Sequence, residues 1–345
     1  MIKMKLAVGI DVGGTNIKYG VFTEAGTLLE KRLLPTGESD DRGEALFSAI
    51  ADETRRIARV YESQGDTVAG VGIGMPGPVL PDGRIENCVN LHLKDINPSR
   101  TLSEMTEGIP FFVGNDANVA ALGELWKGGG KGYRSILLVT LGTGVGSGVV
   151  LEGEIVSGVK GLAGEIGHIV VNPYEKEHCN CGKRGCLDQI ASARGLVRTA
   201  ERMLKFTEAP SVLRSGTSLC AEKIVNAAKA GDALAYIVLD YCMSFLGKCL
   251  ADASYVMDPQ VFVIGGGVSQ GGSIITDMVQ RHYEKTATLV REKTPIVLAE
   301  LGNDAGIYGA AKLVFDRTEK TGSIKVTVSD NEEAQQEIGR EKKIC

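Results

Sequence analysis

The sequence lacks the features that direct a chain into or across a membrane. No apolar run reaches the roughly 18 residues expected of a membrane-spanning helix. Its first residues, Met1–Lys5, lead directly into a strand pattern, without the regions of a signal peptide. We therefore expect a cytoplasmic protein without a membrane segment.

No stretch of the chain carries a large excess of either positive or negative charge. The net charge is −5, and neither basic nor acidic residues form large blocks. A nucleic-acid partner normally demands a basic face, so we expect none. The 43% hydrophobic content is that of an ordinary globular protein, and 345 residues are too many for one small core. Two domains are therefore expected.

Two familiar nucleotide-binding signatures are absent or spoiled. No Gly-x4-Gly-Lys-Ser/Thr occurs, which excludes a P-loop. The stretch Gly72–Gly77 does spell GxGxxG, but Pro76 and Pro78 prevent a helix from starting where a dinucleotide-binding fold needs one. An NAD-dependent dehydrogenase is accordingly disfavoured.

Histidine is also scarce, and one of the four stands just ahead of a cysteine group. The four candidate ligands are His168, Cys179, Cys181 and Cys186. Three thiols and an imidazole are a donor set that structural zinc prefers, whereas the alternative is a free thiol beside a redox pair. Zinc is favoured, with His178 as a second choice of ligand. A bound metal would leave the other ring nitrogen of His168 free to contact a sugar hydroxyl.

The remaining cysteines are scattered along the chain. A cytoplasmic compartment is reducing, so these thiols are expected to be free. They are Cys88, Cys220, Cys242, Cys249 and Cys345.

Hydrophobic periodicity predicts alternating strands and helices. The predicted strands are Lys5–Val12, Ile17–Phe22, Leu28–Leu34, Val68–Gly74, Phe111–Gly114, Ser135–Leu141, Val145–Leu151 and Val261–Ile264. The predicted helices are Glu44–Tyr61, one opened by Asn115 and Asp116 that runs through Trp126, Ser192–Phe206, Leu219–Ala230, Leu234–Met257, Gly272–Leu289 and Asp304–Phe315. The polar, charged stretch from about Thr318 is predicted to be a mobile or weakly ordered tail.

A strand, a glycine turn and a returning strand occur twice, which suggests two similar α/β halves with both turns on one cleft. Glycine lets backbone N–H groups approach phosphate oxygens. Asp11, Gly13, Gly14, Thr15 and Lys18 form the first group, in which Asp11 is able to hold hydrated magnesium. Gly142, Thr143 and Gly144 form the second, and Gly265, Gly266 and Gly267 are predicted to seat a nucleotide. Ordinary turns are the alternative for each group taken alone.

Asn115 and Asp116 stand where a strand ends and a helix begins. Either residue is suited to be the helix N-cap, which needs no ligand. Alternatively, Asp116 is a general base for a substrate hydroxyl, as phosphoryl transfer requires. Glu165 lies three residues before His168, and its position ahead of the cysteine group makes it a candidate site residue as well.

Taken together, these motifs resemble the ROK (repressor, open reading frame, kinase) sugar kinases over Lys5–Asp316, and especially the glucokinases of Gram-positive type. The matching segments are Gly9–Lys18, Gly72–Pro78, Gly114–Asn118, Leu141–Gly146, Gly164–His168 and Cys179–Cys186. The resemblance implies an α/β, actin/hexokinase/Hsp70-like, ribonuclease H-type duplicated two-domain fold with a central cleft. It implies a small domain of residues 1–117 plus about 304–317, a larger domain of residues 118–303, and a tail of residues 318–345.

The resemblance also implies an activity and residue roles. ATP with Mg²⁺ would phosphorylate the 6-hydroxyl of a hexose, most readily glucose, with Asp116 as the base. The hexose would be bound by Gly77, Asn90, Asn115, Asp116, Glu165, His168 and Asp188. The phosphates and Mg²⁺ would meet Asp11, Gly13, Gly14, Thr15, Lys18, Gly142, Thr143 and Gly144, and the adenosine would meet Gly265, Gly266 and Gly267. Structural Zn²⁺ would be held by His168, Cys179, Cys181 and Cys186, and a homodimer is expected.

Two departures from the family pattern concern the hexose. Asp188 stands where the family usually has Glu, so its carboxylate is one methylene shorter. His92 and Leu93 stand where Gly-Trp usually follows Asn-Leu. Kinases for N-acetylmannosamine, N-acetylglucosamine, mannose or fructose therefore stay open, as does polyphosphate as donor. A sugar-sensing ROK regulator is less favoured, since the first strand begins near Lys5 and leaves no room ahead of it for a winged-helix domain.

Overall fold

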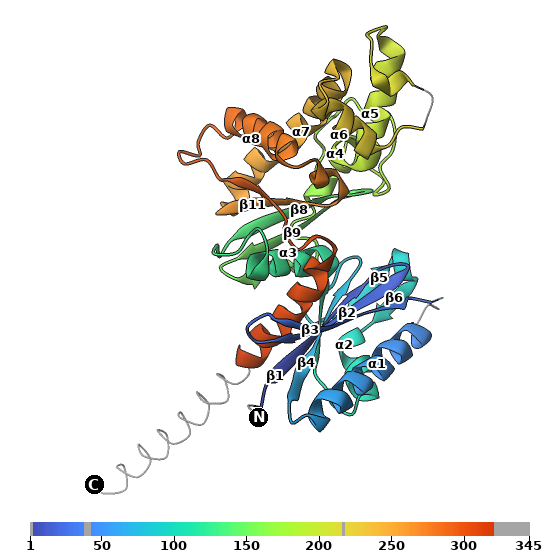
Figure 1. Ribbon diagram of the computed structural model, residues 1–345, viewed down its shortest axis with the longest axis vertical. Helices are drawn as coiled ribbons and strands as arrows, with labels where there is room; N and C mark the ends of the chain where they lie inside the picture. The colour runs from blue at the N-terminus through green and yellow to red at the C-terminus, as the bar shows by residue number, and fades with distance from the viewer. Residues whose placement is uncertain (1–2, 38–42, 216–217, 321–345) are drawn as a thin grey trace, which may run out of the picture.

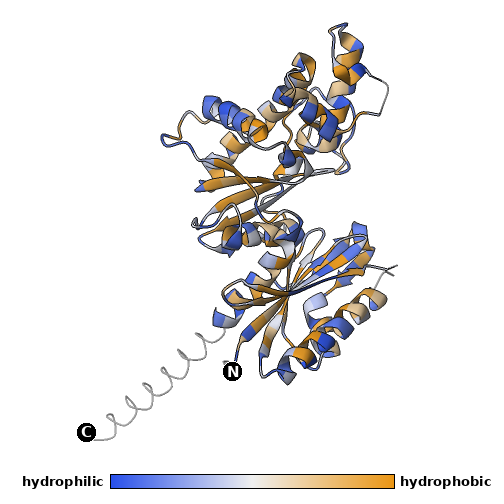
Figure 2. Cartoon of the chain, in the orientation of Figure 1, coloured by the Kyte–Doolittle hydropathy of each residue, from blue (hydrophilic) through white to orange (hydrophobic). Residues whose placement is uncertain are grey.

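The computed structural model describes residues 3–37, 43–215 and 218–320. It contains two α/β domains, one above the other in Figure 1. Each is built on a five-stranded sheet, and Figure 2 shows that the strands are largely hydrophobic. The predicted tail from residue 321 onward, with Cys345, lies outside the described residues.

The first sheet has the order β3-β2-β1-β4-β7. Its strands are β1 (Lys5–Val12), β2 (Asn16–Thr23), β3 (Leu28–Pro35), β4 (Thr67–Met75) and β7 (Phe111–Asn115). The helices α1 (Glu44–Ser63) and α2 (Pro98–Met105) and a hairpin of β5 (Ile85–Cys88), η1 (Val89–Leu91) and β6 (Leu93–Ile96) complete the domain. Strands β1 and β2 are antiparallel, while β1, β4 and β7 are parallel.

Strand β1 shows how this domain is packed. Leu6, Val8 and Ile10 are buried in the same core cluster as residues of α1. The residues between them face a helix of residues 305–320, and Ala7 packs in a cluster with Ile307. The two-residue period of a strand therefore places one helix on each side of the sheet.

The second sheet repeats the first, with the order β10-β9-β8-β11-β12. Its strands are β8 (Ile136–Leu141), β9 (Val145–Leu151), β10 (Glu154–Ile155), β11 (Val261–Gly265) and β12 (Ile296–Leu298). The helical elements are α3 (Asp116–Lys127), η2 (Ile166–His168), α4 (Asp188–Ala191), α5 (Ala193–Phe206), η3 (Val212–Arg214), α6 (Ala221–Lys229), α7 (Ala233–Met257), η4 (Gly267–Gly271), α8 (Ser273–Thr286) and η5 (Gly302–Asp304). The shared strand order confirms the predicted duplicated fold.

Helix α7 bears on the expectation that no apolar run of the chain is long enough to span a membrane. By length and composition alone it is apolar enough to cross a membrane, with a mean hydropathy of 1.4 over the best window. However, 56% of that window is buried, and its side chains pack with those of α5, α6 and α8 in the largest core cluster. The apolar pattern is thus accounted for by the core of the second domain.

The two domains meet where α3 crosses the helix of residues 305–320 (Figure 1). A Cβ added to Gly309 would lie 1.7 Å from the Val119 carbonyl oxygen, and one added to Gly123 would lie 2.2 Å from the Ala305 carbonyl oxygen. The buried carboxylate of Glu124 accepts hydrogen bonds from the N–H groups of Gly129, Glu300 and Leu301 at 2.9, 3.0 and 2.9 Å. This close crossing fixes the floor of the cleft.

The predicted elements are present, with ends shifted by a few residues. Helix α8 ends at Thr286 rather than near Leu289. The last helix continues to residue 320 instead of ending at Phe315, so the predicted tail does not begin at Thr318. The strands divide between the sheets in keeping with the predicted domains, whose boundaries stay a prediction.

The helix crossing predicts an effect on stability. Gly309→Ala would drive a methyl group into the Val119 carbonyl, so we expect a loss of about 1–3 kcal/mol in the free energy of unfolding. Urea denaturation measures it, with the exposed Lys229→Ala on α6 as a control. Equal stability of Gly309→Ala and wild type would contradict the close packing.

Candidate functional site

A pocket of 630 Å³ lies in the cleft and draws residues from both domains. Gly77 and Pro78 come from the loop after β4, and Asn115 and Asp116 come from the junction of β7 and α3. The opposite wall is formed from the second domain. Among its residues are Ser147, Leu162, Glu165, His168 and Ile169.

Asn115 is the N-cap of α3, and this leaves Asp116 free for another role. The side-chain oxygen of Asn115 accepts a hydrogen bond from the Asn118 N–H at 3.0 Å. Its Nδ2 donates to the Gly77 carbonyl at 3.1 Å and to Asp116 Oδ1 at 3.0 Å. Of the two residues that the sequence suggested as the N-cap, Asn115 and Asp116, Asn115 therefore takes this role.

Asp116 carries a perturbed carboxyl group. It keeps part of its surface open to the cleft, but burial raises its pKa to about 6. The charges of Asp11 and Glu165 act in the same direction, while hydrogen bonds from Asn115 and the Ala117 N–H oppose the rise. Such a carboxylate is ionised at neutral pH and basic enough to accept a proton.

Glu165 and His168 are brought to the pocket by a short turn, η2. The turn is tied to β9, because Ser147 Oγ donates to the Gly164 carbonyl and accepts from the Ile166 N–H at 3.2 Å. Burial raises the pKa of Glu165. The wall opposite Asp116 thus presents a carboxyl group and an imidazole to a ligand rich in hydroxyls.

The four predicted metal ligands gather at one point. The donor atoms of His168, Cys179, Cys181 and Cys186 all lie within 4.8 Å of one another. His168 Nδ1 is 3.8 Å from Cys179 Sγ, and Cys181 Sγ is 3.5 Å from Cys186 Sγ. Tetrahedral zinc with Zn–S bonds of about 2.3 Å needs edges of about 3.8 Å, so this donor set fits it.

His178 does not belong to this group of ligands. Its Nδ1 lies 3.1 Å from the Gly182 carbonyl oxygen, and its Nε2 accepts a hydrogen bond from Arg184 at 3.2 Å. Since Nδ1 is the nitrogen of His168 that faces the sulfur atoms, Nε2 is the one left for the pocket. The arrangement supports His168 as the imidazole ligand.

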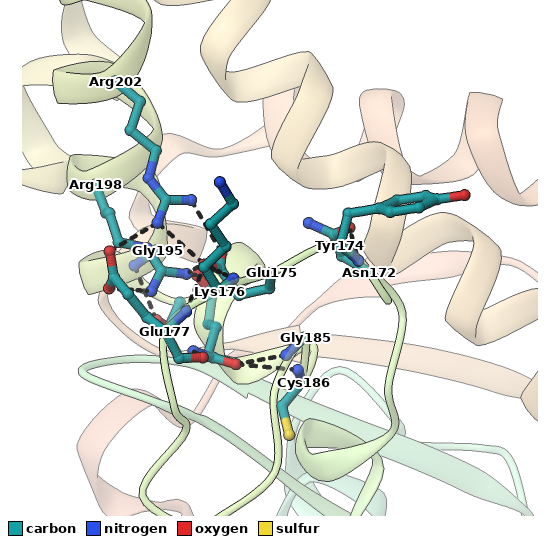
Figure 3. Close-up of polar contacts among 12 residues, drawn as sticks. Asn172, Tyr174, Glu175, Lys176, Glu177, Gly185, Cys186, Gly195, Arg198 and Arg202 are labelled. Atoms are coloured by element: carbon teal, nitrogen blue, oxygen red, sulfur yellow. Dashed lines mark hydrogen bonds and ion pairs between the residues drawn. The ribbon is translucent and has the colours of Figure 1, made fainter.

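An ionic network holds the cysteine loop against α5 (Figure 3). The buried Glu175 accepts from Arg202 at 2.9 and 3.0 Å and pairs with Arg198 at 3.2 Å. Hydrogen bonding to Arg202 is the main cause that lowers the pKa of Glu175 to about 2. Glu177 pairs with the same two arginines at 2.9 and 2.7 Å. These ion pairs therefore hold the cysteine loop on α5 independently of any metal.

A second pocket, of 280 Å³, adjoins the first and shares Asp116, Ala117 and Gly146 with it. Asp11 and Lys18 line it, with Lys18 Nζ 3.3 Å from Asp11 Oδ2 and donating to the Asn303 carbonyl at 2.5 Å. Gly265 and Gly266 line its other side. The position next to Asp116 suits the phosphates of a donor.

Gly13, Gly14 and Thr15 form the hairpin turn between β1 and β2, next to Asp11. The Gly13 N–H donates to the Asn16 carbonyl at 2.9 Å, while Gly14 and Thr15 are exposed. These three residues do not line any of the described pockets, although Asp11 and Lys18 on either side of them in the sequence line the second one.

A third pocket, of 570 Å³, shares Gln270 with the second. Gly142 and Thr143 line it, as does Gly267. The sequence missed two further wall residues, Glu222 and Asn226, which lie one turn apart on α6. Nothing in their local pattern marks them, because α6 reaches the pocket only through the tertiary fold.

Two predicted hexose ligands are not brought into the first pocket. Asn90 is exposed in η1, within the β5–β6 hairpin. Asp188 Oδ1 instead accepts a hydrogen bond from the Val145 N–H at 2.7 Å. With one methylene fewer than Glu, its carboxylate is engaged at the β8–β9 turn.

The chain belongs to the ROK family, whose model matches residues 7–317. It is 42% identical over 314 residues to a glucokinase of Halalkalibacterium halodurans, which covers 89% of this chain and 94% of that protein. A ROK hexokinase from Thermus thermophilus superposes with a TM-score of 0.77 at 32% identity, covering 91% and 99% of the two chains. A ROK family glucokinase from Streptomyces griseus in complex with glucose and AMPPNP gives 0.69 at 33% identity, covering 89% and 98%.

The acid–base properties of the site predict a pH profile. Below a pH of about 6 Asp116 is protonated and cannot accept a proton, so kcat/KM should fall about tenfold per pH unit on the acid side. Because Glu165 is also buried, Glu165→Gln is the control, and its acid limb should persist. A kcat/KM that is flat down to pH 5 would be incompatible with Asp116 as the base.

The ligand cluster predicts bound metal. Elemental analysis of the purified protein should find about one zinc ion per chain. Cys186→Ser should lower that content and the melting temperature, and raise KM for the sugar because His168 loses its anchor. Cys220→Ser, an exposed thiol outside the cluster, should leave all three unchanged. Full activity in a metal-free preparation would contradict the assignment.

Proposed function

We propose that this protein transfers the terminal phosphoryl group of ATP to the 6-hydroxyl of a hexose, most readily glucose. The observation that carries the proposal is the position of Asp116, which lines both the 630 Å³ pocket and the adjoining 280 Å³ pocket. A hydroxyl in the first pocket and a phosphate in the second would meet at this carboxylate. The similarity to the glucokinases named above supports glucose as the acceptor.

The hexose would be oriented by groups on both walls of the first pocket. Asn115, held by Gly77, and Asp116 contact it from one side, while Glu165 and His168 Nε2 contact it from the other. These hydrogen bonds place the 6-hydroxyl against Asp116. As the hydroxyl oxygen bonds to the γ-phosphorus, the bond from that phosphorus to the β–γ bridging oxygen breaks and ADP leaves, while Asp116 accepts the proton of the hydroxyl.

The donor would lie across the second and third pockets. The backbone N–H groups of Gly14, Thr143 and Gly144 and the hydroxyl of Thr15 would bind phosphate oxygens, while Gly13, whose N–H already donates to the Asn16 carbonyl, would shape the turn. Lys18 adds a positive charge, and Gly265, Gly266 and Gly267 would border the adenosine. Magnesium, when bound near Asp11, neutralises charge on the phosphates.

Zinc has a structural part in this proposal. His168, Cys179, Cys181 and Cys186 would hold it, and Nδ1 would be the ligand atom of His168. The imidazole is then oriented with Nε2 toward the hexose. In this proposal zinc takes no part in phosphoryl transfer, which is carried out by Asp116 and the residues around it.

The expected homodimer follows from the family resemblance, and the expected cellular location follows from the sequence features described above. We infer a cytoplasmic homodimer with no nucleic-acid or membrane partner. Sedimentation of the purified protein at several concentrations tests the dimer, and a single monomeric species would contradict it.

The proposal predicts opposite effects of Asp116→Asn on activity and stability. Loss of the base should lower kcat by roughly 10²–10⁴-fold. The folded pKa, about 6, lies above the ordinary 3.8, so ionisation opposes folding increasingly as the pH rises from 3.8 to 6, and fully above 6. At pH 8 the variant should therefore be more stable by about 1–3 kcal/mol, as measured by chemical denaturation.

A panel of sugars tests the acceptor and the donor together. With ATP and magnesium, kcat/KM should be highest for glucose, ahead of mannose, fructose, N-acetylglucosamine and N-acetylmannosamine. A second set of assays replaces ATP with polyphosphate, and the proposal expects ATP to be the better phosphoryl donor. Wild-type turnover by Asp116→Asn, or no transfer to any hexose, would refute the proposal.

A further inference from the structure

The turn between β8 and β9 is held on one side by the segment that follows the last cysteine of the cluster. The Val145 N–H donates to Asp188 Oδ1 at 2.7 Å. Arg194 Nε donates to the Thr143 carbonyl at 2.9 Å, and the Ala193 N–H donates to the Gly142 carbonyl at 2.8 Å. Residues 188–194 thus bind Gly142 and Thr143 of the three-residue turn, and also Val145, the first residue of β9.

Asp188 is packed tightly against this turn. A Cβ added to Gly144 would lie 2.5 Å from Asp188 Oδ1, so the carboxylate would have to shift to make room for a side chain there. Asp188 lines a cavity of 230 Å³ together with His178, Arg194 and Arg198. That cavity is distinct from the pocket that contains Asp116 and Glu165.

The segment that carries Asp188 is itself anchored. Gln189 Oε1 accepts from the N–H groups of Gly185 and Cys186 at 2.8 and 3.2 Å, and its Nε2 donates to the Glu177 carbonyl at 3.1 Å. Arg198 donates to the Gln189 carbonyl. Arg198 also pairs with Glu177 (Figure 3). The carboxylate is therefore presented to the turn from a rigid support.

We propose that Asp188 is a positioning residue for the phosphates of ATP, and not a ligand of the hexose. Its carboxylate oxygen accepts a hydrogen bond from the N–H of the buried Val145, the first residue of β9. The tip of the turn, Thr143 and Gly144, is then set in place to meet the donor. This inference rests on the proposed kinase activity.

The role predicts a specific split in the kinetic constants. Asp188→Ala should raise KM for ATP roughly tenfold, with KM for glucose and kcat within about twofold of wild type. Asp188→Asn keeps an oxygen that accepts from Val145, so its KM for ATP should rise less than about threefold. Arg194→Ala removes a second tie to the turn and should shift the same constant in the same direction.

Glu201→Ala is the matched control, since it removes an exposed carboxylate from α5. It should leave both KM values unchanged. Calorimetry with AMPPNP adds a readout that does not depend on turnover: Asp188→Ala should weaken binding of this analogue by the same factor as KM for ATP.

The opposite split would overturn the proposal. If Asp188→Ala or Asp188→Asn raises KM for glucose, or relaxes the preference at carbon 2, while ATP constants and AMPPNP binding stay unchanged, Asp188 is a hexose ligand. Should Asp188→Ala fail to fold, Asp188→Asn decides by the same constants. A wild-type protein that binds AMPPNP but phosphorylates no hexose would refute the proposed function, while the calorimetric comparison would still test Asp188.

Discussion

The site depends on one amide side chain at the junction of β7 and α3. Asn115 accepts from the Asn118 N–H as the cap of α3, and it donates to the Gly77 carbonyl and to Asp116. Because the cap is supplied by Asn115, the neighbouring carboxylate is not the cap of the helix, although its Oδ1 accepts a hydrogen bond from the Ala117 N–H at 2.8 Å. It is held between two pockets, where burial outweighs the hydrogen bonds that would otherwise lower its pKa.

The cysteine loop connects the acceptor and donor sides of the cleft. Its first proposed zinc ligand, His168, lines the proposed hexose pocket, and the segment after the last proposed ligand, Cys186, leads to Asp188 at the β8–β9 turn. The ion pairs of Glu175 and Glu177 hold this loop on α5. A change in the loop should therefore affect the binding of both the hexose and ATP.

Local patterns were sufficient for the strands and for two similar α/β halves, whereas the fold class came from the resemblance to the ROK family, and the roles of the site residues stay predictions. Hydrophobic periodicity located the strands, and ligand chemistry located the cluster around His168. The same patterns did not reveal the contact of Asp188 with Val145, because that contact depends on one methylene and on a turn 43 residues away. Nor did they reveal Glu124, whose buried carboxylate binds segments distant in sequence.

The most direct test of the account is the position of a bound hexose relative to Asp116. In a crystal structure with glucose and AMPPNP, the account predicts the 6-hydroxyl oxygen about 2.6–3.2 Å from a carboxylate oxygen of Asp116. It also predicts His168 Nε2 in contact with the sugar. A glucose molecule bound in this cleft with its 6-hydroxyl directed away from Asp116 would contradict the account.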